Sequence, residues 1–424
     1  MNVHFAITGG SPMTNDDKTM LALAALTYRG FGKHSEAAID AALRPWLPKL
    51  VEEGLGKWDL VWGPASFRAP TSLFDDAMIY VAQQKDRPAG ARPRYAIAIR
   101  GTNPVSAFDW VFGDFWVSLQ IDWSPGAPAK VSASTALGMA ILKHLAAEVP
   151  PSGGGKLARF GNAVASAFEH LAGTLPELEP RRMLTESHTF TESNLLDRIE
   201  ALSQAAREKV RIGPLGPLFD RFAGSTQQLQ DEIRRRIFDG LIRDIESTKD
   251  KGTKLRSFLD GIEPNALVSV TGHSKGGALA VATALWLQEE WVPTHPAEIE
   301  CFSFAGPTPG NGEFAKRYNA QLAAKTRRIV NRRDVVPHAF VADELRGLRE
   351  FYAPLGPALN ALSDSVAPLA YTHVGGETIQ IGSNAKGGSL IQEIIHQHLD
   401  AYLMDAAYKG SSWNTHAIFL ESQN

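Results

Sequence analysis

Apolar and polar positions follow two different periods along the chain, and the change of period marks the expected elements. Near the start, apolar residues recur at helical spacing over 16–30, and Gly30 is a typical stop, so this range predicts a helix. Short apolar runs rich in aromatic and β-branched residues come next, and these predict strands. The expected strands are residues 58–62, 77–82 and 94–100.

Between residues 103 and 260 the pattern changes. Residues 103–123 contain an unusual density of large aromatic rings, and a helix is expected at about 132–148. The run PPSGGGK then predicts a flexible break, and its spacing does not satisfy the GxxxxGK(S/T) pattern of a phosphate-binding loop. Residues 157–260 are mostly helical in pattern, with amphipathic charged segments such as 226–248.

From residue 266 onwards, strand patterns and helix patterns alternate strictly. The expected strands are 266–271, 298–306, 327–331 and 377–382, and the expected helices are 275–290, 312–324 and 389–407. Strands that alternate with helices indicate parallel pairing, because each crossover helix returns the chain to the same end of the sheet. The pattern therefore predicts an α/β fold with a mostly parallel central sheet.

The composition is that of an ordinary globular protein, and it excludes several classes. Of 424 residues, 44% are hydrophobic and 21% are charged, which excludes wholesale disorder. The formal net charge of -3 lacks the basic excess of a nucleic-acid binder, so no nucleic-acid partner is expected. A single cysteine, Cys301, can form neither an internal disulfide nor a multi-cysteine metal site, and we expect it to be inert core on a strand.

The sequence shows no membrane-targeting pattern. The first residues, MNVHFAITGGSPM, lack the basic and apolar regions of a secretory signal, so we expect a cytoplasmic protein or export by a signal-independent route. No stretch of 18 or more uncharged apolar residues exists, so no transmembrane segment is expected.

The sharpest chemical signal is the segment Gly272-His273-Ser274-Lys275-Gly276, which satisfies the pattern GxSxG. An apolar strand leads into it and a helix of small residues leads out, which is the arrangement that a nucleophile elbow needs. The turn is so tight that the residues two positions from the serine must be small. We therefore interpret Ser274 as a nucleophile, with a plain turn as the alternative.

A serine nucleophile needs a base, and the base needs an acid that orients it. In α/β-hydrolases the acid follows the serine and precedes the histidine. Asp334 comes directly after the expected strand 327–331, where ligands meet open α/β sheets, so it is the first choice of acid. Its alternative role is to cap the loop ahead of Pro337. The weaker candidates for the acid are Asp364, Asp400 and Asp405.

The base must come from the histidines that follow Asp334. They are His338, His373, His396, His398 and His416. Only four residues separate His338 from Asp334, which makes it awkward for both to converge on Ser274. The residues alone leave the choice among His373, His396 and His398 open.

An oxyanion hole needs two backbone N–H donors. The residue after the nucleophile, Lys275, supplies one of them in the usual arrangement. The second donor is expected from a loop that follows an early strand. The run IRGTN after strand 94–100 fits that place, so we assign the second donor to Thr102.

Taken in order, these segments resemble the class 3 lipase family of fungal-lipase-like α/β-hydrolases. IAIRGTN resembles the oxyanion strand of that family, NPVSAFDWVFGDF its lid segment, and VTGHSKGGALA its nucleophile elbow. FSFAGPTPGNGEFA resembles the next strand with its Gly-Asn turn, RRIVNRRDVVPH the segment of the triad Asp, and YTHVGGET the His-Val-Gly motif. The resemblance covers roughly residues 16–148 and 255–408, and it departs from the family at Lys275, where many members carry leucine.

The resemblance also implies which histidine is the base. HQHLDAYL resembles the terminal His-x-x-x-Tyr-Leu segment of the family, which assigns the base to His398, makes His396 the second choice and makes His373 structural. The implied activity is hydrolysis of lipid or small carboxylic esters through an acyl-enzyme, with no cofactor and no metal. A lipase or esterase is the first interpretation, a phospholipase A1-type enzyme the second, and a non-catalytic lipid-binding or interaction module the third.

The aromatic run is expected to form a lid. Its rings would close over the acyl groove and open at a lipid interface, because exposed rings on a short helix form an apolar patch. Ordinary core packing is the alternative. The expected lid and substrate residues are Trp110, Phe112, Phe115 and Trp116.

Ser274 lies 172 residues after Thr102, which is more than a minimal member of the family needs. We therefore interpret residues 151–254 as a helical insertion that caps the site, within a discontinuous α/β-hydrolase core of residues 1–150 and 255–424. A peripheral helical decoration is the alternative. Three adjacent arginines at 234–236 are interpreted as a solvated face, with contact to anionic head groups as the alternative.

Overall fold

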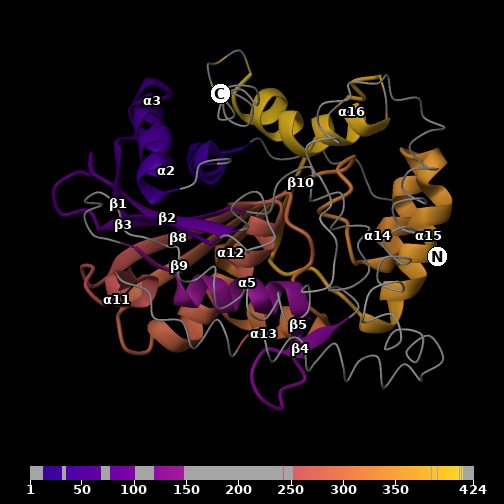
Figure 1. Ribbon diagram of the computed structural model, residues 1–424, viewed down its shortest axis with the longest axis horizontal. Coiled ribbons are helices and arrows are strands. Elements are labelled where there is room, and N and C mark those ends of the chain that lie inside the picture. The colour runs from indigo at the N-terminus through magenta and orange to yellow at the C-terminus, as the bar shows by residue number, and fades with distance from the viewer. Residues whose placement is uncertain are drawn as a thin grey trace, which may run out of the picture.

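A seven-stranded sheet crosses the centre of the molecule, with helices on both of its faces (Figure 1). The computed structural model describes residues 13–30, 35–67, 77–100, 119–147, 252–382, 384–388 and 390–409, together with Ile242, Ser411 and Trp413. In sheet order, the strands are β1 (Trp58–Phe67), β2 (Ala77–Gln84), β3 (Arg94–Arg100), β8 (Ala266–His273), β9 (Ala297–Phe304), β10 (Thr326–Asn331) and β11 (Glu377–Ile381).

The pairing of these strands confirms the predicted α/β class. The first three strands pair antiparallel, and every pairing from β3 through β11 is parallel. Two small antiparallel sheets flank the main one, and their strands are β4 (Gln120–Asp122) with β5 (Lys130–Ser132), and β6 (Ala146–Ala147) with β7 (Thr253–Lys254).

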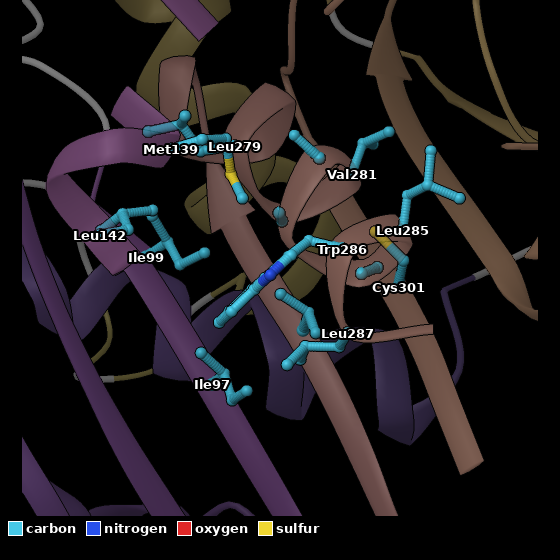
Figure 2. Packing of buried hydrophobic residues seen from close by; sticks show 14 of the residues in the cluster. Ile97, Ile99, Met139, Leu142, Leu279, Val281, Leu285, Trp286, Leu287 and Cys301 are labelled. Atoms are coloured by element: carbon cyan, nitrogen blue, oxygen red, sulfur yellow. The ribbon is translucent and has the colours of Figure 1, made fainter. Parts of the chain in front are cut away.

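Alternation along the central strands divides the core into two clusters, one on each face of the sheet. On β3, Ile97 and Ile99 point to one face, while Ala96 and Ala98 point to the other. Figure 2 shows the isoleucines beside Met139, Leu142, Leu279 and Trp286, which belong to helices that cover the first face. Cys301 of β9 is fully buried in this cluster, as expected.

Different helices cover the two faces. The first face carries α5 (Ala133–His144), α11 (Leu255–Leu259), α12 (Lys275–Trp286), a π-helical turn Leu287–Trp291 and α13 (Gly312–Leu322). The second face carries α1 (Asn15–Leu26), α2 (Glu36–Leu43), α3 (Leu47–Glu52) and a π-helical segment His396–Ala407. Helix α16 (Leu390–Ile395) leads into this segment, and its Ile394 packs in a separate cluster with Leu345 and Leu359. The 3₁₀ turns are Thr27–Gly30, Arg44–Trp46, Ala323–Lys325, Leu348–Glu350, Ala353–Leu355 and Ala367–Leu369.

The first helix is locked both to its own N-terminus and to the sheet. Thr14 caps it, since the Thr14 Oγ1 accepts the Asp17 N–H at 3.2 Å and the Asp17 carboxylate accepts the Thr14 N–H at 2.7 Å. The same carboxylate accepts two hydrogen bonds from Arg327 of β10, at 2.6 and 2.8 Å. This bidentate ion pair joins the start of α1 to the strand that precedes Asp334.

Three expected boundaries differ from the structure. Strand β1 continues past residue 62 to Phe67, because bulges absorb the Gly63-Pro64 pair on this edge strand. The helix expected at 132–148 ends at His144, because residues 146–147 pair with β7 instead. The helices expected at 275–290 and 389–407 widen into π-helical turns from residues 287 and 396.

A helical lobe follows Asp334, and the periodicity did not predict it. It consists of α14 (Ala342–Gly347) and α15 (Gly356–Val366), which pack with the loop after β10 and with Ile394 in an apolar cluster separate from the two sheet clusters. Figure 1 shows this pair, in orange, on the side of the molecule away from β1. The lobe therefore lies between the predicted acid and the predicted base along the chain.

The predicted insertion 151–254 lies outside the described residues, apart from Ile242 and 252–254. Its two flanks meet, because Ala147 of β6 pairs with Thr253 of β7. A segment whose ends lie side by side can be inserted without changing the core, so this pairing agrees with the predicted insertion, which stays a prediction. None of the helices in the described ranges is long and apolar enough to cross a membrane.

Candidate active site

The strand-to-helix turn at Ser274 has the backbone that the GxSxG pattern predicts. Ser274 links β8 to α12 with φ 61° and ψ -133°, and its N–H donates to the carbonyl oxygen of Phe304 on β9 at 2.9 Å. Such a left-handed φ is costly for a residue other than glycine. A Cβ added to Gly272 would lie 2.1 Å from the Gly276 carbonyl oxygen, so the turn excludes any larger residue there.

Asp334 and His398 are joined by a buried hydrogen bond. Asp334 lies in the loop after β10 and is fully buried, and its Oδ2 accepts the His398 Nδ1–H at 2.9 Å. The Oδ1 of Asp334 accepts the Val336 N–H at 3.0 Å, and Oδ2 also accepts the Tyr402 hydroxyl at 3.0 Å. Three donors thus satisfy the carboxylate, which holds His398 in the tautomer with its proton on Nδ1.

His273, the residue before Ser274, contacts His398 directly. The His273 Nε2–H donates to the His398 carbonyl oxygen at 2.9 Å, and the two ring centroids are 4.7 Å apart. Ser274 is the next residue along the chain, so this contact brings the elements of the hydroxyl and the imidazole together.

Two buried polar atoms at this place are left without a partner. Within the part of the chain that the structure describes, neither Ser274 Oγ nor His398 Nε2 makes a hydrogen bond. Unsatisfied buried polar atoms are uncommon in native structures, and each one calls for an explanation. Here one atom is a hydroxyl donor and the other an imidazole acceptor, and catalytic hydrogen bonds are often long before substrate binds.

The surroundings set the protonation of the neighbouring groups. Burial, followed by the proximity of His398, holds the pKa of His273 well below its ordinary value, so His273 stays neutral. Burial, followed by the Asp334 charge, raises the pKa of Tyr402 well above its ordinary value, so its hydroxyl stays a donor.

The alternative bases are bonded to other carboxylates. His396 Nδ1 lies 3.1 Å from Asp400 Oδ2. His373 Nε2 donates to Glu344 at 3.1 Å, and its Nδ1 accepts from Arg328 at 2.8 Å. Burial, followed by the Arg328 charge, lowers the pKa of His373. The structure therefore joins Asp334 to His398, places His398 against His273, the residue before Ser274, and leaves the other two histidines in separate contacts.

Glu344 of the lobe joins two histidines outside the triad candidates. Its Oε2 accepts from His338 at 2.7 Å and from His373 at 3.1 Å. Burial acts to raise the pKa of Glu344, but the two imidazole hydrogen bonds outweigh it and lower that pKa. This network attaches α14 to the loop before β11, so His338 and His373 have structural contacts.

Two of the weaker acid candidates have other contacts, and the side chain of Asp405 is not among those that the structure describes. Asp364 is exposed and pairs with Arg346 at 2.8 Å, while Asp400 contacts His396 and Lys386. Lys275 is the first residue of α12, so its backbone N–H lies at the helix N-terminus, where partial positive charge gathers. Six predicted or candidate residues lie outside the described ranges, namely Thr102, Trp110, Phe112, Phe115, Trp116 and His416.

Two residues of the site, Tyr402 and His273, were missed as functional candidates. Tyr402 follows His398 by four positions, a spacing that places two helical side chains on one face, and this was the available signal. His273 had no signal beyond its place inside GxSxG, because its partner lies 125 residues away.

A cavity of about 200 Å³ lies apart from these residues. It is lined by α5 and the β4–β5 hairpin, and its lining includes Trp123, Met139, Lys143, His144 and Glu290. No residue of the predicted triad lines it. Among the described side chains, no group of three or more His, Cys, Asp or Glu residues is placed to hold a metal ion.

Comparison with known proteins supports the resemblance to lipases. A family model described as Lipase (class 3) matches residues 221–344, a range that contains Ser274 and Asp334. Over this range the chain is similar to the class 3 lipase family, and the lipases described below agree with that likeness. The matched range begins inside the predicted insertion 151–254 and ends before His398.

Curated relatives in the family align over short segments. A lipase of Rhizopus niveus is 37% identical over 75 residues, which cover 18% of this chain and 19% of the relative. Phospholipase A1-Igamma1, chloroplastic, of Arabidopsis thaliana is 36% identical over 115 residues, which cover 26% of this chain and 20% of the relative. The chain thus spans about a fifth of the length of these relatives.

A solved lipase structure matches at full length. The crystal structure of M37 lipase aligns over 96% of both chains with a TM-score of 0.61 and 24% sequence identity. This likeness shows the α/β-hydrolase fold, in agreement with the mostly parallel sheet described above.

Proposed function

We propose that this class 3 lipase relative is a serine carboxylic-ester hydrolase that acts on lipid acyl esters, with Ser274 as nucleophile, His398 as base and Asp334 as orienting acid. The observation that carries the proposal is the buried bond between His398 Nδ1 and Asp334 Oδ2. It leaves His398 Nε2 as an unpaired acceptor beside the strained turn of Ser274.

Acylation follows from these positions. As Ser274 Oγ attacks the ester carbonyl carbon, its proton passes to His398 Nε2, and Asp334 stabilises the resulting imidazolium. The oxyanion forms at the N-terminus of α12, where the Lys275 N–H is one proposed donor and Thr102 is the other. When the carbon–oxygen bond to the alcohol breaks, His398 returns the proton to the leaving oxygen, and an acyl-enzyme remains.

Deacylation uses the same groups in reverse. Water attacks the acyl carbon while His398 Nε2 takes its proton, and the second oxyanion collapses as Ser274 Oγ leaves. The proton then returns from His398 to Ser274, so the cycle releases one carboxylic acid and one alcohol. Every proton transfer in this proposed cycle passes through His398, and none of its steps involves a cofactor or a metal ion.

The substrate class is proposed from the family and from the relatives. The name lipase favours acylglycerols or simpler lipid esters, and the relative named phospholipase A1 supports a phospholipid as the second candidate. We propose that Trp110, Phe112, Phe115 and Trp116 form a lid that opens at a lipid interface, and that residues 151–254 cap the site. Both remain interpretations of sequence, since these residues lie outside the described ranges.

The proposal is tested by measuring hydrolysis rates on p-nitrophenyl esters with acyl chains from C2 to C16. The same rates are then measured on emulsified triacylglycerol and on phospholipid. We expect Ser274→Ala to lower kcat by about 10⁴-fold or more, because the nucleophile is lost. Ser363→Ala is a matched control, since Ser363 is also fully buried and its hydroxyl donates to the Ala342 carbonyl of the lobe.

The outcomes distinguish the candidate functions. Activity in the wild type and the control, with none in Ser274→Ala, supports the hydrolase, and the preferred substrate separates a lipase from a phospholipase. A wild type that binds lipid vesicles but hydrolyses none of the three substrate classes contradicts the proposal. That result favours a non-catalytic lipid-binding module.

A further inference from the structure

The side chain of His273 connects the nucleophile to the base by a short path. His273 is 3% exposed, and its Nε2–H donates to the His398 carbonyl oxygen at 2.9 Å. Because Nε2 carries the proton, Nδ1 is an acceptor, and the Tyr28 hydroxyl lies 3.3 Å from it. Tyr28, in the 3₁₀ turn Thr27–Gly30 that follows α1, thus occupies the acceptor side of the imidazole. The donor side faces the backbone carbonyl of His398.

His398 has two kinds of anchor, and they act on different parts of it. The Asp334 bond holds the imidazole ring, so it sets the rotation of the ring and its tautomer. The His273 bond holds the backbone carbonyl, so it sets where the Cα of His398 lies. A ring with the correct rotation is still displaced from the nucleophile if its backbone moves.

The other anchors of this π-helical segment lead to a different strand. Asn331 of β10 donates from Nδ2 to the Gln397 carbonyl at 2.9 Å, and its backbone N–H donates to the Tyr402 hydroxyl at 2.8 Å. These bonds tie the segment to the strand that precedes the acid. The bond from His273 ties it to β8, whose last residue directly precedes Ser274.

From this arrangement we propose that His273 is a positioning residue that sets the distance between Ser274 Oγ and His398 Nε2. The inference rests on the proposed hydrolase function. His273 does not touch the reacting atoms, and it acts through the backbone of His398. A misplaced base slows proton transfer without changing how substrate binds, so the effect falls on kcat and leaves KM near the wild-type value.

Two polar replacements that differ by one methylene group test the proposal. In His273→Gln, the amide nitrogen reaches about as far as Nε2 and can keep the donor to His398. In His273→Asn, the amide nitrogen matches the position of Nδ1 and falls short of that carbonyl. Both variants are neutral and hydrogen-bonding, so a general loss of packing affects them in the same direction.

We expect His273→Asn to lower kcat on p-nitrophenyl esters by about 10- to 100-fold with little change in KM, as a displacement near 1 Å does. His273→Gln is expected to recover at least a tenth of the wild-type kcat and to exceed His273→Asn clearly. The reaction rate with a fluorophosphonate, which reports how well His398 activates Ser274 without substrate turnover, is expected to follow the same order. Thermal unfolding identifies any variant that fails to fold, and the comparison then uses His273→Gln against the wild type at a temperature where both are folded.

The wild type and Ser274→Ala are measured alongside. Equal kcat for the Gln and Asn variants, or loss that appears mainly in KM, overturns the positioning role while the hydrolase function stands. The positioning role is also overturned if both His273 variants keep the kcat of the wild type. An inactive wild type instead contradicts the proposed function, so the two failures are distinguishable.

Discussion

The turn that carries Ser274 and the C-terminal segment that carries His398 are held in place by different means. Ser274 is placed by main chain: its φ of 61°, its N–H bonded to Phe304, and the absence of a side chain on Gly272. His398 is placed by side chains, through Asp334 on its ring and His273 on its carbonyl. One region is defined by backbone sterics and the other by hydrogen bonds between distant elements.

This difference explains why the Ser274 turn can be predicted from the sequence alone, whereas the choice of the base cannot. A turn that excludes Cβ atoms demands glycine at fixed positions, so the requirement is visible as GxSxG within five residues. A histidine held by hydrogen bonds looks locally like any other histidine. Whether it meets Asp334 or another carboxylate depends on tertiary packing, which distinguishes His398 from His396 and His373.

The sharpest test of the side-chain region compares two histidines of one segment. His398→Ala removes the proposed base, so we expect kcat/KM on p-nitrophenyl esters to fall by about 10⁴-fold or more. His396→Ala removes a neighbour that is paired with Asp400, and its kcat/KM is expected to stay within a few-fold of wild type. A large loss in His396→Ala with near-normal activity in His398→Ala contradicts the assignment of the base.

The steric account of the Ser274 turn is tested by a substitution that adds only a methyl group. In Gly272→Ala the new Cβ would lie 2.1 Å from the Gly276 carbonyl oxygen. The Cβ is fixed by the backbone and the carbonyl is part of it, so neither can move away by a side-chain rotation. We expect a loss of about 3 kcal/mol or more in unfolding free energy, measured by denaturant titration.

Gly347→Ala is the matched control for that substitution. Gly347 ends α14, and a Cβ built there has nothing within 4 Å. Because alanine is the better helix former, we expect its unfolding free energy to stay equal or to rise by up to about 1 kcal/mol. Equal stability of Gly272→Ala and wild type contradicts the steric account of the turn.

The smallest expected effect concerns Tyr402, which donates to the same Asp334 oxygen as His398. Tyr402→Phe removes that donor, so the carboxylate interacts more strongly with protonated His398. The acid limb of the kcat/KM profile is therefore expected to move to higher pH, with loss of activity at low pH and a few-fold change at the optimum. The unfolding free energy is expected to fall by about 1.5–3 kcal/mol, since the donor serves a buried charge.

Tyr80→Phe controls for the loss of a buried tyrosine hydroxyl. Tyr80 is fully buried and its hydroxyl donates to the Leu23 carbonyl at 2.6 Å, away from Asp334. Its pH profile is expected to match that of the wild type. A parallel shift in both variants contradicts the link between Tyr402 and the His398–Asp334 pair.

Much of the fold could be predicted because its strands are buried on both faces. Continuous apolar runs such as 94–100 and 266–271 predict buried strands from the sequence alone. The helix after Ser274 is rich in small residues, which lets it pack closely against β9. The lobe at 342–369 was missed because its helices are short and separated by prolines. Those prolines lie at helix starts, where the missing N–H has no cost, so they were a signal that the breaks were helix beginnings.

The candidate site divides in the same way. Asp334 was expected because the carboxyl end of a parallel strand is a general place for ligands, and this rule needs only the local pattern. The contacts of His273 and Tyr402 join elements 125 and 68 residues apart in sequence. Periodicity gives no information on such contacts, because they depend on how the C-terminal segment packs on the sheet.

The most direct test of the central claim is the reaction of the intact chain with a lipid-like fluorophosphonate, followed by mass spectrometry. The account predicts one adduct per chain on the peptide that contains Ser274, formed as the oxygen–phosphorus bond replaces the phosphorus–fluorine bond. It predicts no adduct in Ser274→Ala and a strongly slowed reaction in His398→Ala. An adduct on another residue, or ester hydrolysis that persists in Ser274→Ala, would contradict it.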